Sequence, residues 1–248
     1  MDSWFGFSFA IRGRKNMMEN LPCQDSVRTW SNGNVACAIL SDGAGSATHS
    51  YRASNSVVNS AIVYYRRFIE NGNDRSLLET GRGVLEAVRE RIKSKAQKLN
   101  TDIKDLACTF LGVFIKDSQY LILHIGDGIV ACMMEDGCIK LLSAGYRGEF
   151  AGETVFLTSE SYENYMKVIE GDVNQERIRA FYLMSDGMES VVYSKRENRF
   201  GKLLYKLYDL NLKYNDKKAL KRKLKESGRE LFNQRTHDDL SIALLGRS

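Results

Sequence analysis

Five aspartates stand where the sequence predicts that β-strands begin, end or turn. Asp42 and Asp186 each follow an apolar run and precede a glycine, and Asp127 lies between two glycines. Asp25 and Asp238 lie just before predicted strands. A single Asp-Gly pair after a strand is usually only a turn. The recurrence weakens that interpretation, because strands that pack together bring their ends together.

A cluster of such carboxylates predicts a site for hard cations. Neighbouring carboxylates repel one another unless a cation neutralises them. All-oxygen ligands favour Mg²⁺, Mn²⁺ or Ca²⁺. Gly43, directly after Asp42, would let its backbone carbonyl approach an ion closely. The sequence contains no HxxxH pair and no cysteine cluster, so it does not favour zinc.

The elements that must position these residues follow from hydrophobic periodicity. Strands are predicted at 3–11, 26–30, 34–41, 107–116, 119–125, 129–134, 138–142, 178–185 and 240–245. Helices are predicted around 57–69 and at about 75–99, 199–211 and 214–233. Because strands and helices come in runs and do not alternate, the pattern predicts an α+β layered fold with antiparallel sheets. We expect 107–142 to form an antiparallel meander and 143–177 to be irregular.

The bulk composition favours one continuous domain over residues 1–248. The chain has 248 residues, a single proline and no linker-like stretch. With 43% hydrophobic and 27% charged residues, it is typical of a soluble globular protein. Neither a signal peptide nor a membrane-spanning window is evident, and the five cysteines form no CxxC pair. We therefore expect a cytoplasmic protein with free thiols.

The formal net charge of +5 is unevenly distributed along the chain. Lysine and arginine dominate residues 213–229, where Asp216 and Glu226 are the only acidic residues. A run of this kind is usually a solvated helix face. The alternative is a surface for an anionic partner, such as nucleic acid or an acidic protein.

Six segments, in order, resemble the PPM-type (type 2C) metal-dependent protein phosphatases, and LPCQD resembles a short, bacterial-like branch of that family. The segments are LPCQDS (21–26), AILSDGAGS (38–46), ACTFLGVFI (107–115), LHIGDG (123–128), FYLMSDGMES (181–190) and THDDLSIALL (236–245). Together they span nearly the whole chain. The resemblance implies a central antiparallel β-sandwich flanked by helix pairs, in four α-β-β-α layers. It also implies hydrolysis of phosphoserine and phosphothreonine in proteins.

The resemblance further implies which residues hold two Mn²⁺ or Mg²⁺ ions. Asp42 would bridge the ions. Asp25 and the carbonyl of Gly43 would complete one site. Asp186 and Asp238 would hold the other ion. Two ions about 3.5–4 Å apart can bridge a water, lower its pKa and present hydroxide in line with phosphorus.

Other positions agree with the family less closely. Asp127 matches an aspartate that can help to hold a third, weaker ion, but Ser190 stands where many relatives carry another aspartate. Ala44 replaces the histidine proposed as general acid in the best-known members, and Asn16 occupies about the place of a histidine in the short branch. Asp239 stands where asparagine is usual, which suggests a supporting role beside the ligands.

A guanidinium group suits bidentate binding of a phosphate. Arg12 and Arg14 lie upstream of Asp25, where the family places such a group, and we favour Arg14. The alternative is that both are surface arginines. Residues 143–177 fill the place of the family's flap, which shapes substrate choice.

Two other functions are consistent with parts of the sequence. One is a weakly active or inactive phosphatase-like module that binds phosphoproteins, although the full acidic set argues against it. The other is a different two-metal phosphoesterase, such as a nuclease that uses the basic 213–229 stretch. Residues 215–229 lack interleaved aromatics, so nucleic acid is the less favoured partner. The sequence names neither the phosphoprotein substrate nor the oligomeric state, and it does not choose Mn²⁺ over Mg²⁺.

Overall fold

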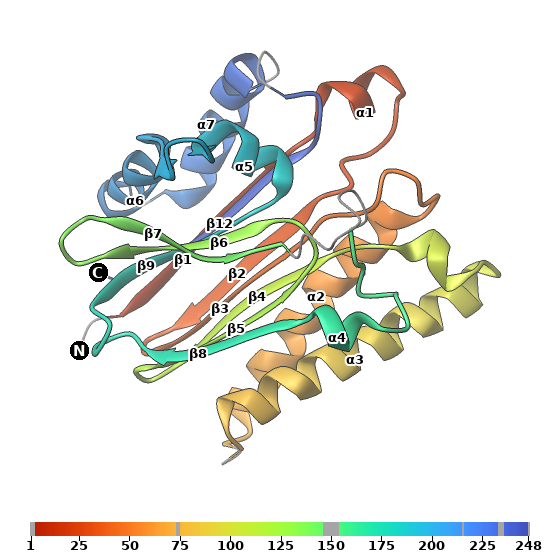
Figure 1. The fold of residues 1–248 in the computed structure, drawn as a ribbon, viewed down its shortest axis with the longest axis horizontal. Coiled ribbons are helices and arrows are strands. Elements are labelled where there is room, and N and C mark those ends of the chain that lie inside the picture. The colour runs from red at the N-terminus through yellow and green to blue at the C-terminus, as the bar shows by residue number, and fades with distance from the viewer. Residues whose placement is uncertain (1–2, 73–74, 146–153, 215, 233–235, 248) are drawn as a thin grey trace.

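The structure is a computed structural model that describes residues 3–72, 75–145, 154–214, 216–232 and 236–247. Two five-stranded antiparallel sheets face each other at its centre (Figure 1). The first sheet has the order β1 (Trp4–Ile11), β12 (Leu240–Arg247), β9 (Ile178–Met184), β6 (Ile129–Met134), β7 (Ile139–Ala144). The second has the order β2 (Ser26–Asn32), β3 (Val35–Ser41), β4 (Phe110–Lys116), β5 (Gln119–Ile125), β8 (Lys167–Asp172).

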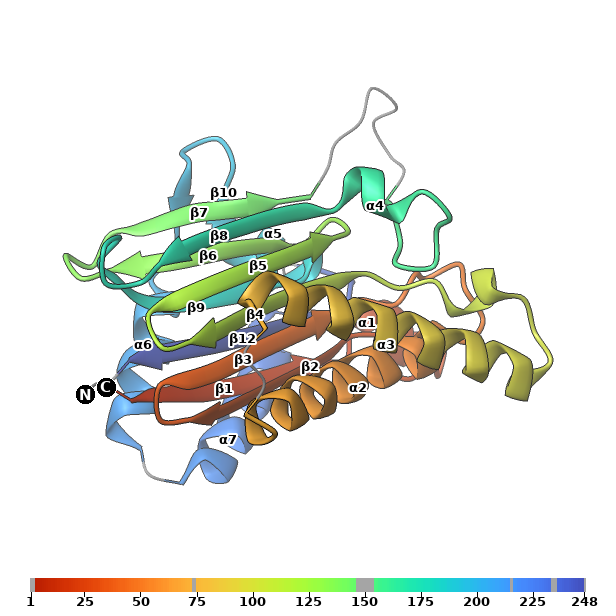
Figure 2. The same cartoon turned by 90° about the horizontal axis from the view of Figure 1, so that it is seen from below.

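Helices cover the outer face of each sheet (Figures 1 and 2). The second sheet is covered by α2 (Ser50–Glu70) and α3 (Leu77–Leu99). The first sheet is covered by α5 (Asp186–Val192), α6 (Leu203–Lys213) and α7 (Lys217–Phe232). The predicted sandwich with helix layers outside is therefore confirmed. Short elements complete the fold: α1 (Arg14–Met18), η1 (Ile103–Leu106), α4 (Tyr162–Tyr165), β10 (Tyr193–Ser194) and β11 (Arg199–Phe200).

Three hydrophobic cores hold the four layers together. One lies between α2, α3 and the second sheet, one between the two sheets, and one between the first sheet and α5, α6 and α7. In the first of these, Tyr65 packs against Phe114 with ring centroids 5.1 Å apart. Its hydroxyl donates a hydrogen bond to the carbonyl of Ile115 at 2.7 Å. The phenol is thereby buried without leaving a polar group unpaired.

Local sequence signals explain several element ends. A hairpin turn joins β2 to β3, where Asn32 pairs with Val35 and Gly33 has φ +61°, a conformation that favours glycine. Helix α3 begins at a capping box in which the side chain of Ser76 accepts from the backbone of Glu79, and the Glu79 side chain returns a bond to the Ser76 backbone. The hairpin at 31–34 agrees with the sequence prediction.

The predicted meander across 107–142 is wrong at one connection. β4 pairs with β5, but β6 pairs with β7 and β9 in the other sheet. The turn at 126–128 therefore carries the chain from one sheet to the other, with Gly126 at φ +124°. Hydrophobic alternation shows that a segment is a strand but not which strand it pairs with. Asp127 consequently lies between the two sheets.

The prediction that 143–177 is irregular is also wrong in part. β7 continues to Ala144, and β8 pairs with β5 at the edge of the second sheet. The sequence of β8 hides its strand character, because only Val168 and Ile169 of its six residues are apolar. Residues 146–153 of this segment lie outside the described residues.

Two short helices near the aspartates are not evident from the sequence. α1 follows Gly13, and α5 begins at Asp186 directly after β9. Both are shorter than the two or more turns that reveal a helical period. In the part of the chain that the structure describes, no helix combines the length and the apolar character needed to cross a membrane.

Candidate metal centre

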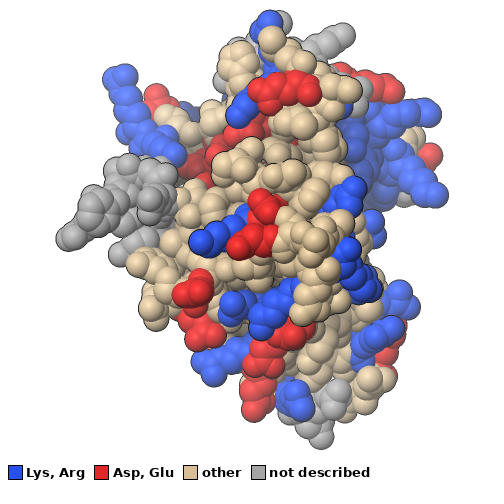
Figure 3. Space-filling view, turned by 90° about the vertical axis from the view of Figure 1, so that its right-hand side faces the viewer, with Lys and Arg blue, Asp and Glu red and all other residues tan. Residues whose placement is uncertain are grey.

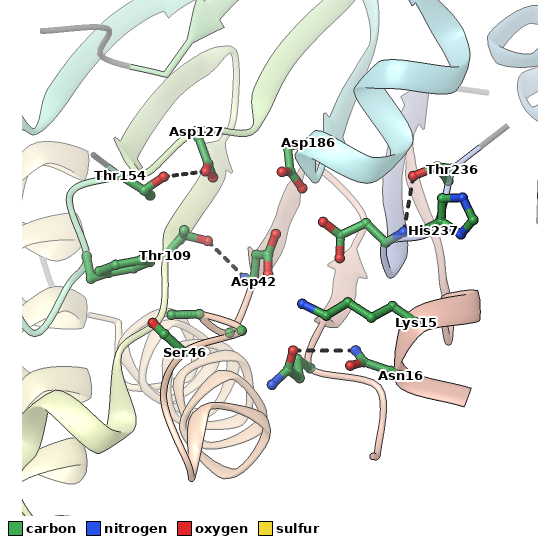
Figure 4. Close-up of a pocket in the computed structure, with 16 residues that line it drawn as sticks. Lys15, Asn16, Asp42, Ser46, Thr109, Asp127, Thr154, Asp186, Thr236 and His237 are labelled. Atoms are coloured by element: carbon green, nitrogen blue, oxygen red, sulfur yellow. Dashed lines mark hydrogen bonds between the residues drawn. The ribbon is translucent and has the colours of Figure 1, made fainter. Parts of the chain in front are cut away.

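A cavity of about 510 Å³ lies at the end of the sandwich where strands from both sheets end. Asp42, Asp127, Asp186 and Asp238 line it, and Figure 4 shows the first three pointing toward one another. Asp42 follows β3, Asp127 joins β5 to β6, Asp186 opens α5, and Asp238 precedes β12. The two sheets thus bring together four of the predicted aspartates from distant parts of the chain.

These carboxylates perturb one another. Burial raises the pKa of Asp42 well above its usual range, and the negative charges of Asp25, Asp186 and Asp127 raise it further. Burial, followed by Asp127 and Asp238, raises the pKa of Asp186 to about 6. Burial, followed by Asp239, also raises the pKa of Asp238, although Lys15 and a backbone hydrogen bond oppose the shift. The cavity therefore concentrates negative charge that favours binding of a cation or a proton.

Asp25 does not line this cavity and is only 5% exposed. Neither of its carboxylate oxygens has a hydrogen-bond partner among the described residues. Burial, followed by the charge of Asp239, raises the pKa of Asp25 to about 7, and nearby Ser241, Ser185 and Asp42 partly oppose that shift. Two buried and unpaired carboxylate oxygens are costly unless a cation or a proton satisfies them.

The donor set fits hard divalent cations, with one restriction. All the side-chain donors are carboxylate oxygens, which Mg²⁺ and Mn²⁺ accept. Among the described residues, however, no three histidine, cysteine, aspartate or glutamate side chains converge closely enough to hold one ion. An ion here would therefore also need backbone carbonyls and water as ligands.

Backbone contacts hold the Asp42 loop in place. The amide of Asp42 donates to Thr109 Oγ1 at 2.9 Å, and the amide of Thr109 donates to the carbonyl of Asp42 at 2.8 Å. A Cβ atom on Gly43 would meet the Cβ of Ser50 at 2.8 Å and the carbonyl of Gln24 at 3.0 Å. Only glycine fits at position 43 without displacing these neighbours.

Asp239 connects the start of β12 to the segment between β1 and β2. Its carboxylate accepts hydrogen bonds from the amide of Gly13 at 2.6 Å, from Asn16 Nδ2 at 2.9 Å and from the amide of Gln24 at 2.5 Å. These bonds place α1 and the segment before β2 against the start of β12. The supporting role expected from position 239 therefore has a geometric basis, and Asn16 contributes to it.

The structure does not bring Arg14 to the cavity. Arg14 is exposed, and Arg12 donates to the carbonyl of Leu21. The neighbouring Lys15 lines the cavity and points its amine into it (Figure 4). Lys15 and not Arg14 therefore lines the cavity, because consecutive residues on a helix face different directions. Because α1 is not evident from the sequence, the direction of the Lys15 side chain could not be predicted.

Thr154 and Thr109 are functional candidates that the sequence prediction missed. Thr154 Oγ1 donates to Asp127 Oδ2 at 2.6 Å (Figure 4), so the segment after residue 153 contacts the aspartate between the sheets. Neither threonine belongs to a motif with a chemical signature. Their positions next to Asp42 and Asp127 emerge only from contacts between distant segments.

Three other titratable residues lie in the same sequence segments as the aspartates, and two of them have structural partners. His124 is buried, and its Nδ1 hydrogen bonds with Ser143 Oγ at 2.7 Å, while burial lowers its pKa to about 4. The buried Glu189 forms an ion pair with Lys195 at 2.9 Å. His237 lines the cavity directly before Asp238. None of the three is a stronger metal candidate than the aspartates.

Comparisons with known proteins identify the family and the fold. A sequence model of the family described as Protein phosphatase 2C matches residues 12–226. Serine/threonine-protein phosphatase 3 of Escherichia coli (strain K12) is 27% identical over 205 residues, which cover 79% of this chain and 78% of that protein.

Solved structures show the same fold. The catalytic domain of the serine threonine protein phosphatase PstP, in complex with two manganese ions, superposes with a TM-score of 0.67 at 16% identity. That similarity covers 100% of this chain and 99% of the other. The serine/threonine phosphatase Stp1 from Staphylococcus aureus gives a TM-score of 0.64 at 16% identity, over 97% and 94% of the two chains. Since the family model spans most of the sequence, the chain belongs to the protein phosphatase 2C family and is a metal-dependent serine/threonine protein phosphatase.

Proposed function

We propose that the cavity binds the phosphorylated serine or threonine of a protein over two Mn²⁺ or Mg²⁺ ions. The observation that carries this proposal is the convergence of Asp42, Asp186 and Asp238 on one cavity, together with the unpaired carboxylate of Asp25. Asp42 would be shared between the ions, with Asp25 and the carbonyl of Gly43 serving one and Asp186 and Asp238 the other. Because no three such side chains converge on one point among the described residues, these carboxylates would have to turn toward the ions on binding.

The bound ions would supply Lewis-acid stabilisation and an activated water. The chain's own contribution is positioning and charge neutralisation, which phosphoryl transfer mainly requires. The ammonium group of Lys15 reaches into the cavity and is suited to contact a phosphoryl oxygen. Ala44 offers no proton at the position of the usual general acid, and Asn16 is committed to Asp239. The leaving oxygen would therefore take its proton from water.

Asp127 is our candidate ligand for a third, weaker ion. It faces Asp42 and Asp186 across the cavity (Figure 4) and raises the pKa of both. Its hydrogen bond with Thr154 uses Oδ2, so Oδ1 can turn toward an ion. We also propose that the protein acts in the cytoplasm on a regulatory phosphoprotein, because its five cysteines are free and a reducing compartment keeps them so.

The test is a phosphatase assay of the purified protein with EDTA, Mg²⁺ or Mn²⁺. Substrates are para-nitrophenyl phosphate and a phosphothreonine peptide, and the variants are Asp42→Asn and Asp186→Asn. We expect metal-dependent phosphate release that falls by at least about 100-fold in both variants, the scale of loss on removing transition-state charge stabilisation. Asp209→Asn, at an exposed position on α6, is the matched control and should keep full activity.

Calorimetric titration with Mn²⁺ separates the competing functions. The phosphatase site is supported if the wild type binds Mn²⁺ and turns over substrate, and if Mn²⁺ binding weakens in Asp42→Asn and Asp186→Asn. Mn²⁺ binding by folded protein without turnover under any condition would instead favour a module that only binds phosphoproteins. Full activity in EDTA would contradict the metal-dependent mechanism.

A further inference from the structure

A second cavity, of about 460 Å³, lies on the side of the sandwich where β1 and β2 are the edge strands. Helix α2 lies beside β2 and α7 lies beside β1 on this side (Figure 2). Both helices and both strands line the cavity, which we call the basic groove. Its lining includes Ser8 of β1, Arg28 and Thr29 of β2, Asn55 of α2, and Lys221 and Lys225 of α7.

The cations of the basic groove are not neutralised. Among the described residues, the side chains of Arg28, Lys221 and Lys225 form no ion pair and donate no hydrogen bond. Burial lowers the pKa of Lys221, and the positive charges of Lys225 and Arg28 lower it further. The three groups thus repel one another, and an anion between them would relieve that repulsion.

The surrounding surface has the same sign. Figure 3 shows lysine and arginine side chains gathered along one edge of the molecule, on the side of α7. In residues 217–226 of that helix, six lysines and arginines stand against Glu226 alone. The charged groups that line the groove are three cations and the buried Asp25, so its excess of positive charge concentrates anionic ligands.

The basic groove adjoins the metal centre. Gln24 lines the first cavity, and the next residue, Asp25, lines the groove. Consecutive residues of the segment before β2 therefore line the two hollows. A peptide whose phosphorylated residue occupies the metal centre can therefore cross residues 21–25, most of which are partly or fully exposed, and enter the groove.

We propose that the basic groove docks an acidic stretch of the phosphoprotein substrate, so that the enzyme prefers phosphorylated residues that have aspartates or glutamates nearby. This inference rests on the proposed function of the metal centre. Arg28, Lys221 and Lys225 bind the carboxylates. Ser8, Thr29 and Asn55 offer hydroxyl and amide groups to the peptide backbone.

The lining favours a peptide over a nucleic acid. Single-stranded nucleic acids bind grooves that combine cations with aromatic side chains on which bases stack. The lining of the basic groove contains three cations but no aromatic residue among its described members. The groove is therefore suited to carboxylates on a flexible chain more than to stacked bases.

The test compares three substrates: para-nitrophenyl phosphate, a neutral phosphothreonine peptide, and the same peptide extended by a run of aspartates on either side. The charge-reversed variant is Lys221→Glu/Lys225→Glu. Lys206→Glu/Lys223→Glu changes the net charge equally at exposed positions outside both cavities and is the matched control.

We expect the wild type to hydrolyse one of the two acidic peptides with a kcat/KM about tenfold above that of the neutral peptide, the scale of two or three partly exposed ion pairs. The preference for the acidic peptide should come from a lower KM and should shrink as the salt concentration is raised. It should disappear in Lys221→Glu/Lys225→Glu and persist in the control. Turnover of para-nitrophenyl phosphate should be unchanged in both variants.

Equal kcat/KM for acidic and neutral peptides in an active wild type would overturn the docking proposal while leaving the phosphatase function intact. An equal loss of the preference in the control variant would also overturn it, because the effect would then be one of net charge. An oligonucleotide that inhibits hydrolysis of the acidic peptide by the wild type and the control, but not by Lys221→Glu/Lys225→Glu, would assign the groove to nucleic acid instead. Absence of turnover with every substrate would count against the proposed function itself.

Discussion

At the scale of single residues, the candidate site shows how much one side chain's direction matters. Arg14 and Lys15 are neighbours with the same sign of charge, yet only Lys15 lines the cavity. Asp42, Asp127, Asp186 and Asp238 were identifiable because each belongs to a short motif beside a strand. Lys15 belongs to no such motif, and the five-residue helix that directs it is too short to be recognised from periodicity.

We predict that Lys15→Ala lowers kcat/KM for phosphopeptides by roughly tenfold to 100-fold, because a charged hydrogen bond to phosphate contributes about 1.5–3 kcal/mol. Lys15→Arg should retain most of the activity, since it keeps the charge. Steady-state kinetics with a phosphothreonine peptide measure both. Arg14→Ala is the matched control and should behave like the wild type. A larger loss in Arg14→Ala than in Lys15→Ala would return the phosphate-binding role to Arg14.

At the scale of elements, the junction of α5 and β12 holds Asp186 near Asp238. Gly187 lies so close to residue 239 that a Cβ atom would stand 2.0 Å from the carbonyl oxygen of Asp239. The same Asp239 uses its carboxylate to hold Gly13, Asn16 and Gln24. One short contact region therefore links α5, β12, α1 and the segment that precedes β2.

We predict that Gly187→Ala weakens Mn²⁺ binding by about tenfold and lowers phosphatase activity in parallel. The added methyl group must push α5 away from β12, and overpacking of this kind typically costs about 1–3 kcal/mol. Calorimetric titration and the peptide assay measure the two effects. Gly201→Ala is the control, since its Cβ would meet only the Val192 carbonyl at 3.4 Å. Wild-type Mn²⁺ affinity in a folded Gly187→Ala protein would refute this explanation of the junction.

At the scale of the whole molecule, the acidic site is expected to cost stability when no cation is bound. Burial and mutual repulsion raise the pKa values of Asp25, Asp42 and Asp186, all in the same direction. The folded protein therefore retains protons that the unfolded chain releases from about pH 4 upward. Over the interval from the ordinary value of 3.8 to about 7 for Asp25, the unfolding free energy falls as the pH rises.

We predict that the metal-free protein is more stable at about pH 5 than at about pH 7.5, by an amount on the order of a few kcal/mol. Mn²⁺ should reverse the trend, because it competes with protons and its stabilisation increases with pH. Denaturant unfolding in EDTA and in Mn²⁺ at both values measures this. Asp25→Asn should flatten the slope in EDTA, and a stability that rises with pH in EDTA would contradict the assigned direction of the shifts.

How much the sequence predicted differs from one feature to another. The strand boundaries near Asp42 and Asp127 were predicted closely, since alternation and glycine-containing turns are local signals. The pairing of β6 with β9, and not with β5, was not predicted, because pairing depends on contacts between distant segments. The strand β8 was missed because its polar residues conceal it.

The sequence by itself determined the layered α+β class, the family and the aspartates that converge on the cavity, because each rests on residue type and local spacing. Only the tertiary structure decided that Lys15 faces the cavity, that Asp239 holds segments 215 to 226 residues away, and that Arg28 joins Lys221 and Lys225 in one groove. These features depend on which surfaces of separate elements pack together. That packing is a property of the whole chain and leaves no local signature in the sequence.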